Sequence, residues 1–170
     1  SCGYCYYCKV LNEPTLCPNT RSYGISIPCN EPPYINGGFS EYIYIRPQTD
    51  VVKVPKDVSV KEVLAAGCAG ATMAHAVERG RVSLGDVVVV QGGGGLGLFG
   101  IALALASGAQ KVISIPGRRE ARLKLAERLG AEVIDMNRLP EVEKRVEVVK
   151  RLTPGGYGAD VVFECTGNPE

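Results

Sequence analysis

Four cysteines lie within the first seventeen residues of the chain, at a spacing that suits a metal ion. They are Cys2, Cys5, Cys8 and Cys17. Gaps of two residues let a chain double back so that four thiolates surround one zinc ion, with each sulfur about 2.3 Å from the metal. Four thiolates leave zinc no open position for water or substrate, so such a site is structural. Free or redox-active cysteines are the alternative, and a nucleic-acid-binding zinc ribbon is disfavoured because the loop carries little basic charge.

A glycine-rich turn at residues 92–97 is the second feature with a chemical meaning. It reads Gly92-Gly93-Gly94-Gly95-Leu96-Gly97 and contains G-x-G-x-x-G at Gly92, Gly94 and Gly97. The turn follows an apolar run and opens a helical one, which is the context in which this motif binds a dinucleotide. Glycine lets the backbone approach a pyrophosphate, and the helix amino terminus offers unpaired N–H groups to that anion. The turn therefore predicts an NAD or NADP site.

The end of the second strand in this region bears on the choice between the two cofactors. An NAD site commonly places a carboxylate there, which receives the ribose 2′-hydroxyl. The chain instead reads Ile115-Pro116-Gly117-Arg118-Arg119. Two arginines could bind a 2′-phosphate, which favours NADP. The alternative is that Arg118 and Arg119 are solvated residues at the start of a helix.

Strands and helices alternate along the chain from residue 86 onward. Short apolar runs predict strands at 86–91, 111–115, 132–135 and 160–164. Helical spacing fills the intervals at 97–107, 118–129 and 140–152, with Gly108 and Gly130 as stops. This alternation predicts an α/β fold, a Rossmann-type parallel sheet of about four strands joined by right-handed crossovers.

The first sixty residues have a different character, rich in proline, tyrosine and loops. Alternating residues predict strands at 39–45 and 51–54. Small and apolar residues at helical spacing predict a helix from 60 to 80, interrupted near Gly67. We therefore expect a β-rich zinc lobe at 1–60, a linking helix at 61–80 and a dinucleotide-binding domain at 81–170.

The composition narrows the range of partners and locations. Nineteen basic and eighteen acidic residues give a net charge of +1, so we expect neither nucleic acid nor a membrane surface as a partner. No apolar run is long enough to span a bilayer, and no secretory signal opens the chain. The cysteine count of seven is odd, which argues against a disulfide framework. We expect a reducing, cytoplasmic setting.

Two residues of the predicted linking helix could also do chemistry. Cys68 falls between the two lobes, where a thiolate could face both cofactor and substrate, although a cysteine among small residues is more often part of the core. His75 is the only histidine. Seven residues of helix separate the two by about 10.5 Å, so they do not readily bind one ion. We expect His75 to pack or cap locally.

These features together resemble the zinc-containing medium-chain alcohol dehydrogenases, including the sorbitol and threonine dehydrogenases, over essentially the whole chain. The cysteine loop resembles their structural zinc lobe, and 90–97 resembles their coenzyme turn. The segments 37–42, 125–131 and 160–167 carry further signatures, Gly-Gly-Phe-Ser-Glu-Tyr, Leu-Ala-x-x-Leu-Gly-Ala and Asp-Val-Val-Phe-Glu-Cys-Thr-Gly.

The resemblance implies roles for particular residues. It makes Cys68 one ligand of a catalytic zinc, Thr72 a contact near the nicotinamide and Arg122 a contact near the adenosine. Thr166 and Gly167 would line the cofactor cleft. The implied reaction passes hydride from a small alcohol or polyol to NAD or NADP, with zinc as Lewis acid. It further implies that the zinc lobe is part of a GroES-like domain and that the full-length protein is a homo-oligomer.

Three features depart from the family's pattern. The loop from Cys8 to Cys17 is one residue longer than is common, and the carboxylate after the second strand is missing. The family's other catalytic zinc ligands, a cysteine and a histidine–glutamate pair, precede the zinc lobe and do not occur in this sequence. We therefore expect a central fragment of a longer dehydrogenase, inactive alone. The alternatives are a truncated zinc-stabilised module that binds a dinucleotide without catalysis, and a zinc-free quinone reductase, which Cys68 and the cysteine lobe disfavour.

Overall fold

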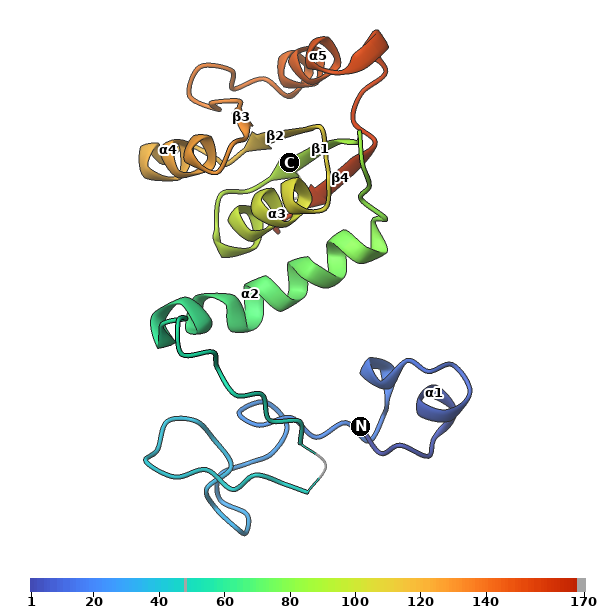
Figure 1. The fold of residues 1–170 in the computed structure, drawn as a ribbon, viewed down its shortest axis with the longest axis vertical. Helices are drawn as coiled ribbons and strands as arrows, with labels where there is room; N and C mark the ends of the chain where they lie inside the picture. The colour runs from blue at the N-terminus through green and yellow to red at the C-terminus, as the bar shows by residue number, and fades with distance from the viewer. Residues whose placement is uncertain (48, 168–170) are drawn as a thin grey trace. The chain divides into compact units, whose positions relative to one another are not determined.

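The computed structural model describes residues 1–47 and 49–167, so the last three residues of the predicted dinucleotide-binding domain lie outside it. The chain divides into two compact units, Ser1–Lys53 and Val54–Glu170. Figure 1 shows short helical turns and loops in the first unit, and helices around a sheet in the second.

Short helical segments around the cysteines are the regular structure of the first unit. These are the helix α1 (Tyr6–Lys9) and the 3-10 helix η1 (Pro14–Leu16). The strands predicted at 39–45 and 51–54 are wrong, because neither segment pairs with a neighbouring strand. The segment around Tyr44 is held by one backbone hydrogen bond, from its N–H to the Ile35 carbonyl at 3.0 Å, and by a side chain. The Tyr23 hydroxyl donates to the Tyr44 carbonyl at 2.6 Å and accepts from the Arg46 N–H at 2.7 Å.

The second unit contains a four-stranded parallel sheet, as predicted. Its strands are β1 (Val87–Gln91), β2 (Lys111–Ile115), β3 (Glu132–Val133) and β4 (Val161–Glu164). They lie in the order β3-β2-β1-β4, and all three pairs are parallel. In register, Gln91 of β1 lies between Ile115 of β2 and Glu164 of β4. The three strands therefore end at one edge, where ligands of open α/β sheets bind.

Helices connect these strands in the predicted order. They are α3 (Gly95–Ala106), α4 (Glu120–Arg128) and α5 (Val142–Leu152), followed by the 3-10 helix η2 (Pro154–Gly156). The predicted stops are confirmed, since Gly108 and Gly130 follow the ends of α3 and α4 with φ of 97° and 98°. A left-handed conformation of this kind ends a helix and costs glycine little.

The helix α2 (Val60–Arg79) precedes the sheet and runs without interruption. Its start is fixed by a capping box, in which Ser59 and Glu62 each accept from the other's backbone N–H. The predicted break near Gly67 is wrong, because one glycine costs a helix only about 1 kcal/mol relative to alanine. Met73 and Val77 are buried against the dinucleotide-binding region and anchor the helix there.

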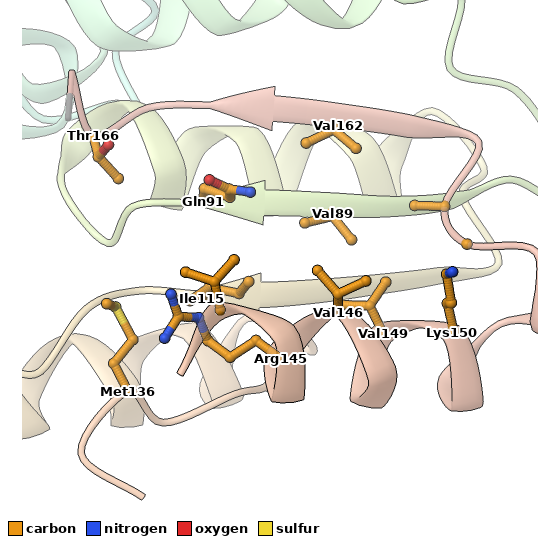
Figure 2. Close-up of a pocket in the computed structure, with 13 residues that line it drawn as sticks. Val89, Gln91, Ile115, Met136, Arg145, Val146, Val149, Lys150, Val162 and Thr166 are labelled. Atoms are coloured by element: carbon orange, nitrogen blue, oxygen red, sulfur yellow. The ribbon is translucent and has the colours of Figure 1, made fainter. Parts of the chain in front are cut away.

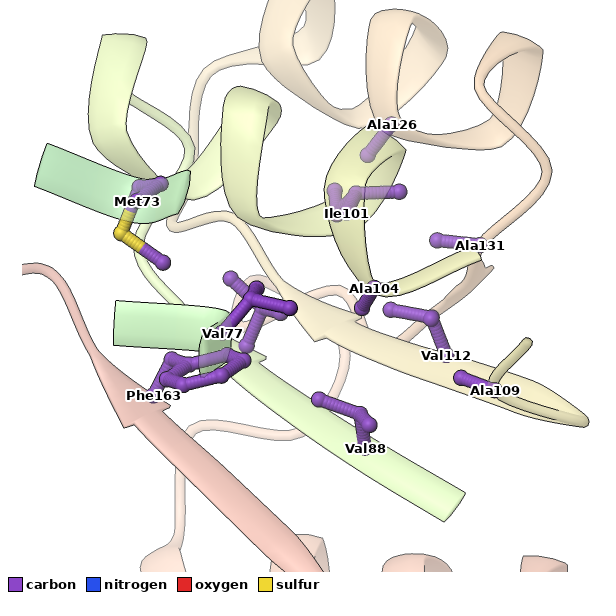
Figure 3. Packing of buried hydrophobic residues seen from close by; sticks show 11 residues of the cluster. Met73, Val77, Val88, Ile101, Ala104, Ala109, Val112, Ala126, Ala131 and Phe163 are labelled. Atoms are coloured by element: carbon purple, nitrogen blue, oxygen red, sulfur yellow. The ribbon is translucent and has the colours of Figure 1, made fainter. Parts of the chain in front are cut away.

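Both faces of the sheet are covered, which explains the continuous apolar sequence of β1. Val88 and Val90 point into the larger cluster, where α2 and α3 contribute Met73, Val77 and Ile101 (Figure 3). The other two valines of β1, Val87 and Val89, lie on the opposite face, in a smaller cluster with part of α5. Within residues 1–47 and 49–167, no helix is long and apolar enough to cross a membrane.

Candidate metal centre and dinucleotide site

The four cysteine sulfurs converge in the first unit. All four lie within 4.8 Å of one another. The Sγ–Sγ distances are 3.6 Å for Cys5–Cys8, 3.8 Å for Cys5–Cys17 and 3.6 Å for Cys2–Cys17. A tetrahedral Zn–S₄ centre with bonds of about 2.3 Å requires sulfurs about 3.8 Å apart. The cluster therefore fits a zinc ion.

Local structure explains why the sulfurs meet. Cys5 precedes α1 and Cys8 lies within it, so the two side chains share one helical face. The 3-10 helix η1 then reverses the chain and delivers Cys17, whose side chain is buried. At the start of the loop, Gly3 has a φ of 79°, which lets the chain turn between the first two cysteines.

Backbone N–H groups around the sulfurs favour the thiolate form of two cysteines. The Tyr4 N–H donates to the sulfur of Cys2 and is the main reason that its pKa falls to about 6. The Cys2 N–H lies 3.4 Å from the Cys17 sulfur and lowers the pKa of Cys17. At Cys5 the Cys8 N–H acts in the same direction, but burial and hydrogen bonds with the neighbouring thiols raise the pKa to about 11. Metal binding would therefore release protons.

The glycine turn of the second unit is closely packed at the start of α3. A Cβ atom on Gly97 would lie 1.8 Å from the Gly92 carbonyl oxygen, so no side chain fits there. The Gly92 N–H donates to the Ile115 carbonyl at 2.9 Å, which ties the turn to the end of β2. A Cβ on Gly94, by contrast, would meet no atom within 4 Å. The turn thus has open space beside Gly94, at the amino terminus of a twelve-residue helix, where a pyrophosphate could bind.

Loops from two neighbouring strands flank this turn. A Cβ on Gly93 would lie 2.5 Å from the Pro116 carbonyl oxygen, at the end of β2. A Cβ on Gly92 would lie 2.9 Å from the carbonyl group of Cys165, at the end of β4. The three loops therefore form one continuous edge, with β1 at its centre.

The segment after β2 carries the predicted ribose-binding residues. We call residues 117–119 the arginine turn. Gly117 has a φ of 89°, and Arg119 is the N-cap of α4 without a side-chain capping bond. Arg118, Arg119 and Arg122 are exposed. None of the three forms an ion pair with a carboxylate in the described parts of the chain, 1–47 and 49–167, so their charges are available to an anion.

The end of β4 is organised by a carboxylate. Glu164 Oε1 accepts hydrogen bonds from the Thr166 N–H at 2.5 Å, the Thr166 hydroxyl at 2.6 Å and the Gly167 N–H at 2.9 Å. These bonds, led by that from the Thr166 hydroxyl, lower the pKa of Glu164. These hydrogen bonds fix the loop that contains Thr166 and Gly167, the two residues predicted to line the cofactor cleft.

On α2, Cys68 and Thr72 lie one helical turn apart, and both are exposed. The expectation that a cysteine here would be part of the core is therefore wrong, since this side of the helix faces away from the buried Met73 and Val77. The residue after Cys68 is Ala69, whose methyl group would lie 3.4 Å from a Cβ on Gly95. Cys68 thus belongs to the part of α2 that passes the start of α3.

His75 is also exposed and does not pack into the core. Its Nδ1 lies 3.6 Å from Glu78 Oε2, one turn further along α2, and its side chain is 68 % accessible to solvent. It forms a local ion pair when protonated and lies on the same helix as Cys68 without approaching it. The structure therefore does not bring Cys68 and His75 together as ligands.

A groove of about 540 Å³ runs along the sheet face beside α5. Figure 2 shows Val89 and Gln91 of β1 facing Val146 and Val149 of α5 across it. The groove reaches the edge of the sheet where the strands end, between Ile115 and Thr166. Its walls are mainly apolar, as a surface that receives an aromatic base would be.

Sequence reasoning missed two contacts at this edge. Pro116 packs against the glycine turn, and Asn137 donates to the Arg118 carbonyl at 3.0 Å. The second contact joins loops nineteen residues apart. The sequence gives only a weak signal for the Asn137 contact. Asp135 and Asn137 follow a strand, and this spacing is typical of a turn.

Comparison with known proteins agrees with this arrangement. Residues 95–170 match a family model described as zinc-binding dehydrogenase. Over 99 % of its length the chain is 33 % identical to alcohol dehydrogenase 2 of Caenorhabditis elegans, and over 98 % it is 32 % identical to a sorbitol dehydrogenase of Halalkalibacterium halodurans. Among solved structures, an alcohol dehydrogenase from Thermotoga maritima is 43 % identical and superposes with a TM-score of 0.91 over 99 % of this chain.

The resemblance to the zinc-containing alcohol dehydrogenases is confirmed. The chain spans 44 % of each of these two curated dehydrogenases and 46 % of the solved one. The cysteine cluster could hold a zinc ion, as the family's description as zinc-binding suggests. The roles given to individual residues stay predictions.

Proposed function

We propose that this chain is the structural-zinc and dinucleotide-binding portion of a zinc-dependent alcohol or polyol dehydrogenase. The observation that carries the proposal is the packed edge at Gly92–Gly97, where loops from β2 and β4 close on the glycine turn and leave Gly94 open. The converging sulfurs of the cysteine cluster add independent support. The substrate would be a small alcohol or polyol, and the cofactor would accept hydride from its carbinol carbon.

Residues of this chain would bind and orient the dinucleotide. The N–H groups at the start of α3 would receive the pyrophosphate, and the apolar groove beside Ile115 would receive the adenine. The loop clamped by Glu164 would close the cleft on the side of β4. Zinc bound by the four cysteines would cross-link the first unit and take no part in the reaction, because it has no open position.

The chain by itself supplies too few ligands for a catalytic zinc. Cys68 is the candidate by resemblance, and the single histidine of the sequence is paired locally with Glu78. We therefore propose that the chain alone binds cofactor but does not oxidise alcohols. Turnover of an alcohol panel above a protein-free blank, lost on chelation, would contradict this proposal. The second candidate function is a non-catalytic module. It would apply if a longer protein that contains this chain also bound a dinucleotide but did not oxidise an alcohol.

For the cofactor we propose NADP rather than NAD. Arg118 and Arg119 are exposed and carry unpaired positive charge beside the glycine turn, and the segment between β2 and Arg119 contains no carboxylate. Arginine binds phosphate through charge-assisted, often bidentate, hydrogen bonds. A reducing, cytoplasmic location and homo-oligomeric assembly are further expectations of the proposal.

Titration of the chain with NADPH and NADH tests the cofactor assignment. We expect NADPH to bind at least about tenfold more tightly, and this ratio to fall about tenfold in Arg118→Ala or Arg119→Ala. Arg128→Ala is the matched control, since Arg128 lies at the opposite end of α4, about 12 Å along the helix. Equal affinities for the two cofactors, or a ratio that neither arginine variant changes, would overturn the assignment to NADP.

A further inference from the structure

The arginine turn is attached to a second loop through one side chain. Asn137 lies after β3, and its Nδ2 donates to the Arg118 carbonyl at 3.0 Å. This bond links the turn to the loop that follows the next strand of the sheet. Because a carbonyl oxygen of the turn itself is the acceptor, the bond acts on the backbone that carries Arg118 and Arg119, and leaves their guanidinium groups free.

The loop that presents Asn137 is itself held in place at both ends. At the start, the Asp135 side chain accepts from the Asn137 N–H at 2.8 Å, and the Asp135 carbonyl accepts from Arg138 and Leu139 at 3.1 and 3.0 Å. At the end, the buried Arg145 side chain donates from Nη1 to the carbonyls of Leu139 and Pro140. The loop backbone that carries Asn137 is therefore held by hydrogen bonds before any ligand binds.

The arginine turn is held mainly at its two ends. Gly117 has a φ of 89° and would meet no atom within 4 Å of an added Cβ, so neither a side chain nor close packing restricts it. Arg119 makes no side-chain capping bond. Before the turn, Pro116 packs against the glycine turn, and after it the Arg119 carbonyl accepts from the Arg122 and Leu123 N–H groups at 2.9 and 3.2 Å. Asn137 binds the carbonyl of Arg118, between these two supports.

We propose that Asn137 is a positioning residue that holds the arginine turn in the conformation that binds a phosphorylated ribose. The inference rests on the proposed binding of NADP. Without Asn137, the backbone at Arg118 samples more conformations, and ordering the turn on binding costs affinity. The effect is specific for the 2′-phosphate, because the glycine turn and the groove bind the rest of the nucleotide.

The test compares binding of 2′,5′-ADP and 5′-AMP to the full chain and to Asn137→Ala. The two probes differ by the 2′-phosphate and need no turnover. We expect the variant to bind 2′,5′-ADP about fivefold more weakly and 5′-AMP with less than a twofold change. Loss of folding would weaken both probes alike, so the ratio of affinities separates a positioning role from a merely structural one. Should Asn137→Ala fail to fold, Asn137→Ser replaces it in the same comparison.

Asn30→Ala is the matched control, because Asn30 is exposed and belongs to the first unit. If the unmodified chain prefers 2′,5′-ADP and Asn137→Ala keeps the full preference, the positioning role is refuted while the cofactor assignment stands. If the unmodified chain shows no preference for 2′,5′-ADP, the assignment to NADP fails and the inference fails with it. A preference that falls in Asn137→Ala and not in Asn30→Ala supports both.

Discussion

The two units of the chain achieve order in different ways. Among the described residues of the first unit, the buried apolar side chains are Cys17 and Ile27, and Phe39 is fully exposed. The second unit buries a continuous cluster on one face of its sheet and a smaller one on the other. We therefore expect the first unit to depend on a metal cross-link at its cysteines, whereas the second depends on hydrophobic burial.

This difference shows how a short, loop-rich segment can be specified by very few residues. A four-cysteine zinc site contributes about 10–16 kcal/mol of binding free energy at neutral pH, which replaces the core that such a segment lacks. The sheet of the second unit needs no such ion, because Val88 and Val90 on one face and Val89 on the other are buried.

The largest effect predicted from this comparison is the loss of zinc in Cys17→Ser. We expect the purified chain to contain about one zinc per molecule and the variant less than about a tenth of that, because removing one thiolate opens the site. Elemental analysis measures this directly. Cys29→Ser is the control, since Cys29 is exposed and lies outside the cluster. Full zinc content in Cys17→Ser would mean that the four sulfurs are not the site.

The next effect concerns the second unit alone. In Gly97→Ala the new methyl group would meet the Gly92 carbonyl at 1.8 Å, a backbone contact that no side-chain rotation relieves. We expect a loss of about 3 kcal/mol in the free energy of unfolding and a midpoint lower by about 10 °C. Denaturant and thermal unfolding measure both.

Gly94→Ala is the matched substitution in the same turn, since its methyl group meets no protein atom within 4 Å. This variant should unfold like the original chain and bind NADPH about tenfold more weakly, because the methyl group occupies the approach of the pyrophosphate. Unchanged affinity in Gly94→Ala would place the dinucleotide elsewhere.

The smallest effect concerns the loop after β4. Hydrogen bonds to its carboxylate lower the pKa of Glu164, so its contribution to stability is complete above its ordinary pKa and is lost as the pH falls through the lowered value. In Glu164→Gln we expect the thermal midpoint to fall by no more than about 2 °C at pH 7, since the side chain is exposed. The difference should vanish once the pH lies below the lowered pKa of Glu164. A difference that persists there would arise from packing rather than charge.

Most of the second unit could be predicted from its sequence. The apolar run 87–90 is buried on both faces, and glycines after α3 and α4 end these helices, because local propensity and burial favour the same structure there. The cysteine spacing likewise predicts the convergence of four sulfurs, since each ligand is close to the next along the chain.

The remaining features depend on contacts that a sequence pattern does not contain. The alternation at 39–45 suits a strand, but a strand needs a neighbouring strand. The segment is held instead by a single backbone bond to Ile35 and by the Tyr23 hydroxyl. The exposure of Cys68 follows from which side of α2 packs on α3. The bond between Asn137 and the arginine turn depends on β2 and β3 being neighbours in the sheet.

Hydrogen exchange of the zinc-loaded chain, measured with and without a strong chelator, tests the difference between the two units most directly. We predict that chelation removes protection from amides around Cys5–Cys17 and leaves the amides of β1, β2 and α3 protected as before. The same experiment with NADPH should add protection at Gly92–Gly97. Protection of the cysteine loop that survives complete removal of zinc, or loss of protection in the sheet on chelation, would contradict the account.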